Sequence, residues 1–384
     1  MIESKDRILT THVGSLPRPD DLVDLLMLQD RGDTYDTEKL ALRVHESVAA
    51  IVAKQTEMGI DSVSDGEMGK VSYVNYLKHR LDGFGDSAPL GWSPRDLVDH
   101  PGFVEQQRSK NSGGPRVDPP ACIGPLKVKN RAPLEADLAN LRAAVDRAGA
   151  KEAFVPAASP GVVVLFLRNK FYPSEEAYVA ALADVLQEEY EEIHRVGFVV
   201  QIDCPDLAMA RHMLYADLSL AEFRRVVARN VEALNHATRN IPPSALRMHL
   251  CWGNYAGPHT HDVPLKDVAD LVFKARPQAV LFEAANPRHA HEWEDLKSAR
   301  IPDDKILVPG AIDTNTNHVE HPQLVAQRLC AFADIVGRER VIASTDCGFG
   351  TFAKLPPVYP TIAWEKLKSL VDGARMASER LWVR

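Results

Sequence analysis

Long hydrophobic runs are missing from this chain of 384 residues. No apolar stretch approaches the roughly 20 residues that a membrane-spanning helix requires. The opening segment, MIESKDRILTTHVGS, is charged and lacks the apolar centre of a signal peptide. We therefore expect no membrane partner and a cytoplasmic location.

Cysteine is also scarce, with five in the whole chain. An odd and sparse set in a reducing compartment does not form a disulfide framework. Each cysteine is therefore either a packed core residue or a residue with a chemical role. The five are Cys122, Cys204, Cys251, Cys330 and Cys347.

An excess of positive charge is absent as well. The 45 basic residues are outnumbered by 53 acidic ones, which gives a formal net charge of -8. Without a basic stripe, nucleic acid is not the expected partner. The sequence also lacks an internal repeat and the G-x-G-x-x-G fingerprint of dinucleotide-binding folds. Its 45% of hydrophobic residues is nevertheless ample for a large core.

What the chain does contain is a regular alternation of short apolar runs and amphipathic helical patterns. Such alternation predicts a mostly parallel sheet, and eight strands suit an α/β fold of the (β/α)8 TIM-barrel type. We expect the whole chain, 1–384, to form this one domain. The expected strands are 8–13, 60–64, 154–157, 198–203, 247–251, 279–283, 306–310 and 341–345. The expected helices include 37–58, 174–196, 220–237, 265–275 and 322–336.

Two segments do not fit this simple alternation. The run IGPLKV at 123–128 is a ninth candidate strand for eight places, so one of the nine is an extra or edge strand. Residues 83–120 are rich in Gly, Pro, Ser and charge, which is typical of an inserted excursion from a barrel. Such an excursion is either a lid over the site or a solvated insertion.

Polar and reactive residues follow the ends of six expected strands. In α/β barrels the carboxyl ends of the strands form the face that carries the active site. We therefore expect these residues to meet at one rim. They lie in Gly14-Ser15, Asp65-Gly66-Glu67, Asp203-Cys204-Pro205, His249-Leu250-Cys251, Glu283 and the stretch from Ser344 to Gly348.

Four of these residues suggest a metal site. His249 and Cys251 are two apart on one strand, so their side chains share a face. Glu283 ends the next strand and Cys347 follows the last one. One imidazole, two thiolates and one carboxylate favour zinc in tetrahedral geometry. Taken singly, a buried cysteine can instead be a small apolar core residue. That is the reading we give to Cys122, Cys204 and Cys330.

At these residues the chain resembles a known family. The segments TTHVGSLPRP, DGE, QIDCP, HLCWGNY, LFEAANPRHAHEW and STDCGFG are similar to motifs in the catalytic, C-terminal half of the cobalamin-independent methionine synthases and their single-barrel relatives. The resemblance extends from about residue 9 to about residue 352. It implies that His249, Cys251, Glu283 and Cys347 are the ligands of a catalytic zinc ion.

The resemblance also assigns substrate residues. It implies that Ser15, Glu67 and Asp203 hold the amino-acid end of homocysteine, with the two carboxylates facing the ammonium group. Alternatively, Glu67 and Asp203 orient loops or histidine side chains. We also expect His12, in the first of these motifs, at the substrate.

The chain departs from the family in two places. It does not contain the N-terminal barrel of the long synthases, so folate polyglutamate binding by that barrel is not implied. Where the synthases carry a catalytic histidine, this chain reads AIDTNTN, with Asn315 at the nearest match. The proton donor for the leaving group must then lie elsewhere, and we take Asp313 as the candidate catalytic residue. Further candidates are His12, His259, His261, His289, His291 and His318.

The ligand set predicts the type of reaction. Two thiolates and one carboxylate leave zinc formally at -1, which makes it a weak Lewis acid but still able to hold a substrate thiol as thiolate. We predict a zinc-dependent thiol methyl- or alkyltransferase, with the methylation of homocysteine in methionine biosynthesis as the first expectation and a folate as one candidate donor.

Three alternatives remain open from the sequence. The first is alkylation of another thiol, as in epoxyalkane:coenzyme M transferase, which belongs among the short relatives. The second is hydrolase or lyase chemistry by zinc hydroxide. The third is a barrel with a structural zinc, or a module that binds a thiol or a folate. The oligomeric state is not predicted.

Overall fold

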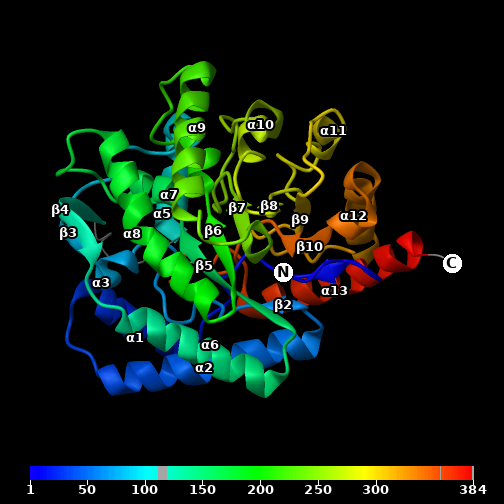
Figure 1. The fold of residues 1–384 in the computed structure, drawn as a ribbon, viewed down its shortest axis with the longest axis horizontal. Helices are drawn as coiled ribbons and strands as arrows, with labels where there is room; N and C mark the ends of the chain where they lie inside the picture. The colour runs from blue at the N-terminus through cyan, green and yellow to red at the C-terminus, as the bar shows by residue number, and fades with distance from the viewer. Residues whose placement is uncertain (111–118, 355, 383–384) are drawn as a thin grey trace.

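The computed structural model describes residues 1–110, 119–354 and 356–382. Eight parallel strands form a sheet in the order β1-β10-β9-β8-β7-β6-β5-β2, with helices around it (Figure 1). The strands are β1 (Leu9–Thr10), β2 (Ser62–Val63), β5 (Glu152–Ala158), β6 (Val199–Asp203), β7 (Leu246–Leu250), β8 (Ala279–Phe282), β9 (Ile306–Ile312) and β10 (Ile342–Thr345).

The sheet curls until its two edge strands meet. The backbone N–H of Asp61, next to β2, donates to the carbonyl of Thr10 in β1 at 3.0 Å. All eight predicted strands are present, and the predicted TIM barrel is confirmed as a nearly closed one. That the chain is a single domain stays a prediction.

Helices cover the outside of the barrel. Asp36 and Ser174 start two of them by accepting the backbone N–H groups of Lys39 and Ala177. The longer helices are α1 (Asp20–Arg31), α2 (Thr37–Met58), α6 (Ala132–Ala148), α8 (Glu175–Arg195), α9 (Leu220–Ala237), α12 (Pro322–Val336) and α13 (Pro360–Leu381). The shorter ones are α3 (Leu77–Arg80), α7 (Pro160–Phe166), α10 (Ala269–Val272) and α11 (Trp293–Leu296). Among the described residues, no helix is long and apolar enough to cross a membrane.

The prediction of one continuous helix at 265–275 is wrong. The segment 265–275 is a 3₁₀ turn, Leu265–Asp267, followed by the four-residue α10. Neither part has a capping side chain, and Pro277 disfavours helical geometry at the residue before it. Its start is instead fixed from outside, because the Leu265 N–H donates to Glu292 at 2.8 Å.

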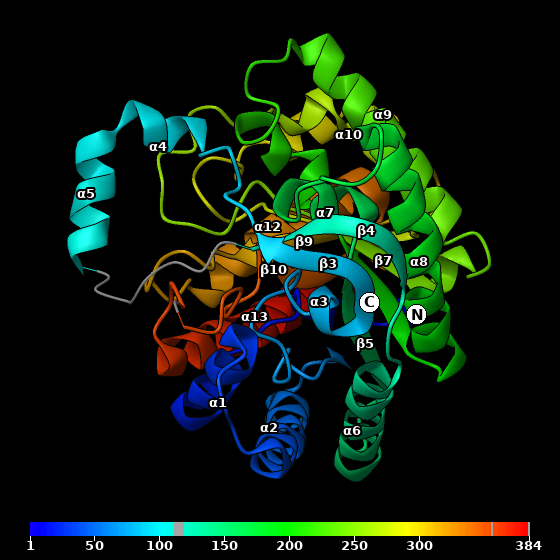
Figure 2. The ribbon, with the colours of Figure 1, turned by 90° about the vertical axis from the view of Figure 1, so that its left-hand side faces the viewer.

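The ninth candidate strand lies outside the barrel. It belongs to β4 (Pro120–Val128), which pairs antiparallel with β3 (Leu81–Ser87). The excursion expected at 83–120 therefore starts and ends in this hairpin. It also contains α4 (Arg95–Asp99) and α5 (Pro101–Lys110), which stand out on one side of the barrel (Figure 2). The part at 111–118 lies outside the described residues.

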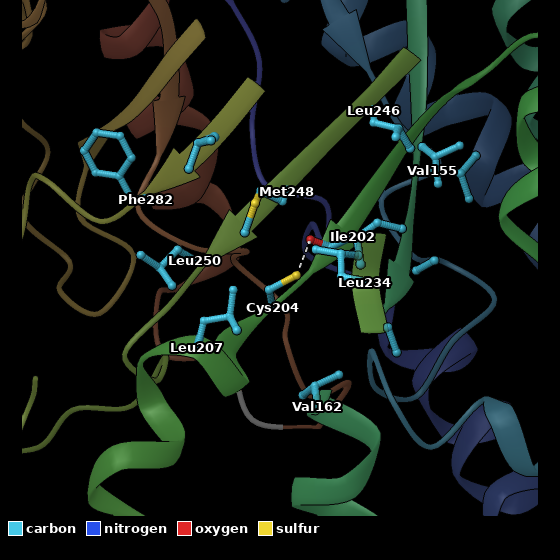
Figure 3. Packing of buried hydrophobic residues seen from close by; sticks show 14 of the residues in the cluster. Val155, Val162, Ile202, Cys204, Leu207, Leu234, Leu246, Met248, Leu250 and Phe282 are labelled. Atoms are coloured by element: carbon cyan, nitrogen blue, oxygen red, sulfur yellow. Dashed lines mark hydrogen bonds between the residues drawn. The ribbon is translucent and has the colours of Figure 1, made fainter. Parts of the chain in front are cut away.

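The main core fills the space between strands and helices. Figure 3 shows Cys204 inside it, packed near Val162, Ile202 and Leu207. Cys122 is buried in the same cluster, and Cys330 packs against it. The structure therefore places these three cysteines where packing alone accounts for them, as expected.

Candidate active site

Three of the predicted metal ligands converge at the carboxyl end of the barrel. His249 and Cys251 come from the end of β7, and Cys347 follows β10. The two sulfur atoms lie 3.1 Å apart, and Cys347 Sγ lies 3.7 Å from His249 Nε2. All three ligand atoms fall within 4.8 Å of one another, and all three residues are buried. The sulfur separation is far above the about 2.05 Å of a disulfide, so both are free thiols.

The chemistry of this donor set fits a soft divalent cation. Burial lowers the pKa of His249 to about 4, which keeps its imidazole neutral, and its Nε2 lies 3.0 Å from the carbonyl of Asp346. The hydrogen bond to Cys251, followed by burial, raises the pKa of the Cys347 thiol well above its ordinary value. A cation at this point would reverse that preference, because a coordinated thiol is deprotonated. The three residues thus form a group that can hold a metal ion.

Glu283, the fourth predicted ligand, lies beside this group and is not one of its three members. Its Oε1 accepts the backbone N–H of Trp252 at 2.8 Å, and its Oε2 accepts the side-chain amide of Asn286 at 2.6 Å. Burial raises the pKa of the Glu283 carboxyl. Because Trp252 directly follows Cys251, this bond holds the Glu283 carboxylate next to the loop that carries Cys251. Its role as a ligand stays a prediction.

Asp346 connects the loops that carry these residues. Its carboxylate accepts the backbone N–H groups of Ala284, Ala285 and Asn286 at 2.8 to 2.9 Å. Ala284, directly after Glu283, is therefore bonded to Asp346, directly before Cys347. Sequence analysis gave Asp346 no role, although its place beside a predicted ligand in STDCG was the available signal.

Two predicted substrate residues form a buried acidic pair. Burial, and then the charge of Glu67, raises the pKa of Asp203 to about 8. Asp203 Oδ1 accepts from Gln201 at 2.8 Å and lies 3.8 Å from His249 Nδ1. Glu67 has a φ of 58°, which is uncommon for a residue other than glycine, and its Oε2 has no hydrogen-bond partner among the described residues. Burial raises the pKa of Glu67 although the charges of Lys70 and Arg18 act against it, so an added ammonium group would stabilise the charged pair.

Ser15 and Arg18 stand next to this pair. The Ser15 hydroxyl accepts the N–H of Gly350 at 3.3 Å. Arg18 is buried, and its Nε donates to the Glu67 carbonyl at 3.0 Å while Nη1 donates to that of Gly350 at 2.6 Å. Its Nη2 lies 3.8 Å from Glu67 Oε2 and, within the part of the chain that is described, has no hydrogen-bond partner. Sequence analysis missed Arg18, although it stands inside the quoted motif.

His12 has other contacts than those predicted. Its Nε2 bonds Gln55 of α2 at 2.7 Å, and its ring packs edge-on against Phe154. Neither partner is a predicted site residue. Burial lowers the pKa of His12 to about 4, so the ring is neutral. These contacts attach His12 to the helix layer, while its Nδ1 has no hydrogen-bond partner among the described residues, and its role at the substrate stays a prediction.

The Asp313 carboxylate is hydrogen-bonded to residues of its own turn. One carboxylate oxygen accepts the N–H of Asn315 at 2.9 Å, and the other accepts the Thr316 hydroxyl at 2.6 Å. This arrangement explains the AIDTNTN segment as a side-chain-capped turn after β9. Its role as proton donor stays a prediction that these contacts do not favour.

Tyr73 is a further polar residue at the rim that sequence analysis missed. Its ring meets Phe166 and Phe352 edge-on, with centroids 5.8 and 6.3 Å away. Burial, and then the charges of Cys251, Asp203, Cys347 and Glu67, raises the pKa of its hydroxyl well above the usual value. The Tyr73 hydroxyl therefore lies close enough to the thiols and to the acidic pair for their charges to raise its pKa.

Comparison with known proteins supports the family resemblance. No family model matches the chain. The methionine synthase of Thermococcus kodakarensis is 24% identical over 374 residues, which is 97% of this chain and 94% of the relative. The methionine synthase of Saccharolobus solfataricus is 23% identical over 377 residues, with 97% and 95% covered.

Among solved structures, a B12-independent methionine synthase from Shewanella sp. W3-18-1, in complex with selenomethionine, has the same fold. The match has a TM-score of 0.73 at 21% identity and covers 98% of this chain and 99% of that one. The fold and the length of the sequence match agree with the motifs at the rim. The chain is therefore similar to methionine synthases over nearly its whole length and has the same barrel fold as a B12-independent synthase.

Proposed function

We propose that this protein is a zinc-dependent transferase that methylates a thiol, with homocysteine as the acceptor and methionine as the product. The observation that carries the proposal is the convergence of His249, Cys251 and Cys347 at the active-site rim of the barrel. The curated relatives with similarity over 97% of the chain are named methionine synthases, which supports the same reaction.

In this proposal His249, Cys251 and Cys347 hold the zinc ion, and Glu283 completes the set. Zinc bound there would lower the pKa of a substrate thiol and so favour its thiolate form near neutral pH. The ligand set, formally at -1, leaves such a sulfur nucleophilic but lowers the pKa of water poorly. The charge therefore favours thiol transfer over hydrolysis.

The acidic pair and Arg18 would orient the amino-acid end of the acceptor. Glu67 and Asp203 are buried beside each other, and an ammonium group between them would offset the repulsion that raises the pKa of Asp203. The Ser15 hydroxyl and Arg18 Nη2, which has no hydrogen-bond partner in the described part of the chain, would donate to the carboxylate of the same substrate. A thiol that carries a sulfonate and no ammonium would add no cation to the two carboxylates, which favours homocysteine over coenzyme M. The methyl donor would be a small molecule with an activated methyl group, such as a folate.

A metal and activity assay tests the proposal. Purified protein is expected to contain about one zinc per chain and to turn over only when a thiol is present. Cys347→Ser and Cys251→Ser should each lose most of the zinc and the activity, whereas Cys330→Ser, in a helix away from the rim, should keep both. Full zinc occupancy in the double variant Cys251→Ser, Cys347→Ser would overturn the metal assignment. Turnover without a thiol would point to hydrolase or lyase chemistry.

A further inference from the structure

A second buried polar cluster lies beside the metal group and is centred on Asp262. The Asp262 carboxylate lies 3.1 Å from His212 Nδ1, 3.0 Å from His259 Nδ1 and 3.0 Å from His289 Nε2. Its side chain is only 4% exposed. A carboxylate buried to this degree is costly unless it is bonded, and the imidazoles of His259 and His289 hydrogen-bond this one while that of His212 lies within ion-pair distance. The family motifs did not assign any of these residues a role.

On one side the cluster reaches the metal ligands. The His289 ring stacks on Trp252 with centroids 4.1 Å apart. The backbone N–H of Trp252 in turn donates to Glu283, and its indole N–H donates to the carbonyl of Val263 at 2.7 Å. Trp252, which directly follows Cys251, is thus held both by Glu283 and by the His289 ring of the Asp262 cluster.

On the other side the cluster reaches the excursion. The Tyr255 hydroxyl lies 3.3 Å from His212 Nε2 and donates to both oxygens of Asp96 in α4, at 2.9 and 3.0 Å. Asp96 also accepts the backbone N–H of His259 at 2.7 Å. Although α4 belongs to a segment that projects from the barrel, Asp96 is fully buried against this loop.

The turn that meets Asp96 has an unfavourable backbone conformation. His259 has a φ of 52°, a left-handed value that residues with a side chain seldom adopt. Such a conformation persists only when surrounding contacts hold it. The bonds from His259 to Asp96, to Asp262 and from its Nε2 to the Tyr255 carbonyl are contacts of this kind.

We propose that Asp96 and Tyr255 form a latch that docks α4 on the 252–263 loop, and that Asp262 is the positioning residue that passes this docking on to Cys251 and Glu283. The inference rests on the proposed zinc site, because its main consequence concerns how firmly the ligands hold the metal. Residues that orient metal ligands typically change metal affinity by about 10- to 100-fold when they are mutated.

Zinc release into an excess of a chromogenic chelator tests the latch. Asp96→Asn and Tyr255→Phe are expected to release zinc at least about tenfold faster than the wild type. Arg95→Gln is the matched control, since Arg95 lies in the same helix and pairs at the surface with Asp217, which is outside the 252–263 loop. Its release rate should equal that of the wild type. Folded latch variants that release zinc within about twofold of the wild-type rate would overturn the inference.

Hydrogen exchange of the metal-free protein separates this inference from the proposed function. Asp96→Asn and Tyr255→Phe should speed amide exchange in 252–263, including the His259 amide, whereas Arg95→Gln should not. If the wild type binds no zinc, the proposed function fails while this exchange result still decides the latch. If zinc binds and exchange is unchanged in both variants, only the latch fails. Tyr255→Phe removes a single oxygen, so it keeps the test decisive should Asp96→Asn not fold.

Discussion

At the residue scale, burial decides how the side chains of the site behave. It keeps His249 neutral and raises the pKa of Asp203. In both cases the low-dielectric surroundings penalise the charged form. A bound metal cation or ammonium group would stabilise the charged forms of the carboxylates and thiols over their neutral forms. The site is therefore arranged for positively charged occupants.

Substitution of Glu67 tests the ammonium site. Glu67→Gln removes one charge-assisted hydrogen bond, which is typically worth about 1.5 to 3 kcal/mol. The KM for homocysteine should rise by about tenfold or more, with a smaller change in kcat. Steady-state kinetics measure this, with Glu46→Gln, a surface carboxylate paired with Arg43, as the control. An unchanged KM would exclude Glu67 from substrate binding.

Tyr73→Phe tests the phenol at the rim. The charges of the thiols and of the acidic pair raise the pKa of the Tyr73 hydroxyl. The alternative donor, Asp313, is hydrogen-bonded within its own turn. If the phenol delivers the leaving-group proton, its loss should lower kcat by about 100-fold or more at constant zinc content. The ring contacts with Phe166 and Phe352 remain, so the fold should hold. A kcat within a few-fold of the wild type would remove Tyr73 from the chemistry.

The pH dependence of stability tests the Asp262 cluster. Burial alone would lower the pKa of His289, but its bonds to Asp262 and Glu292 outweigh burial and raise the pKa to about 10. A raised pKa stabilises the fold fully below the unfolded value, about 6.5, and this stabilisation is lost as pH rises towards 10. The difference in unfolding free energy between wild type and His289→Gln should therefore shrink from pH 6.5 to pH 10. A difference that stays constant or grows over that range, in denaturant titrations, would contradict the charged state of His289.

At the element scale, the alternation of apolar runs was sufficient to predict all eight barrel strands and most of the named helices. These elements follow from local periodicity and caps such as Asp36, which the sequence displays directly. The 265–275 helix was wrong because its start is fixed by Glu292, a contact across 27 positions. The place of α4 depends on the bond between Asp96 and Tyr255, 159 positions apart, which no local pattern reveals.

Gly310 in β9 offers a test of how the elements support the site. A Cβ at this position would lie 2.2 Å from Asp346 Oδ1 and 2.6 Å from its Cα. Gly310→Ala should therefore displace Asp346 from the turn after Glu283, destabilise the fold by about 1 to 3 kcal/mol and weaken zinc binding. Gly102→Ala is the control, because a Cβ there meets no atom within 4 Å. Denaturant unfolding and zinc titration measure both effects. Equal behaviour of the two variants would show that the close approach of Gly310 and Asp346 has no role.

At the scale of the whole molecule, the barrel explains how residues far apart in the chain form one group. Cys251 and Cys347 are 96 positions apart, yet parallel strands bring their ends to one rim. The spacing of His249 and Cys251 and the family motifs were sufficient to predict the three converging ligands. The bonds of Glu283 to Trp252 and Asn286 could not be read from the sequence, because they depend on how the loops after the strands fold. Asp262 was missed for a similar reason, although its partners His259 and His289 were among the candidate histidines.

The most direct measurement of the central claim is X-ray absorption at the zinc edge of the wild-type protein, with and without homocysteine. The account predicts about one zinc per chain with two sulfur ligands and one nitrogen ligand, and a third sulfur when homocysteine is added. A zinc site whose sulfur count does not change with the thiol, or a protein that binds no zinc, would contradict it.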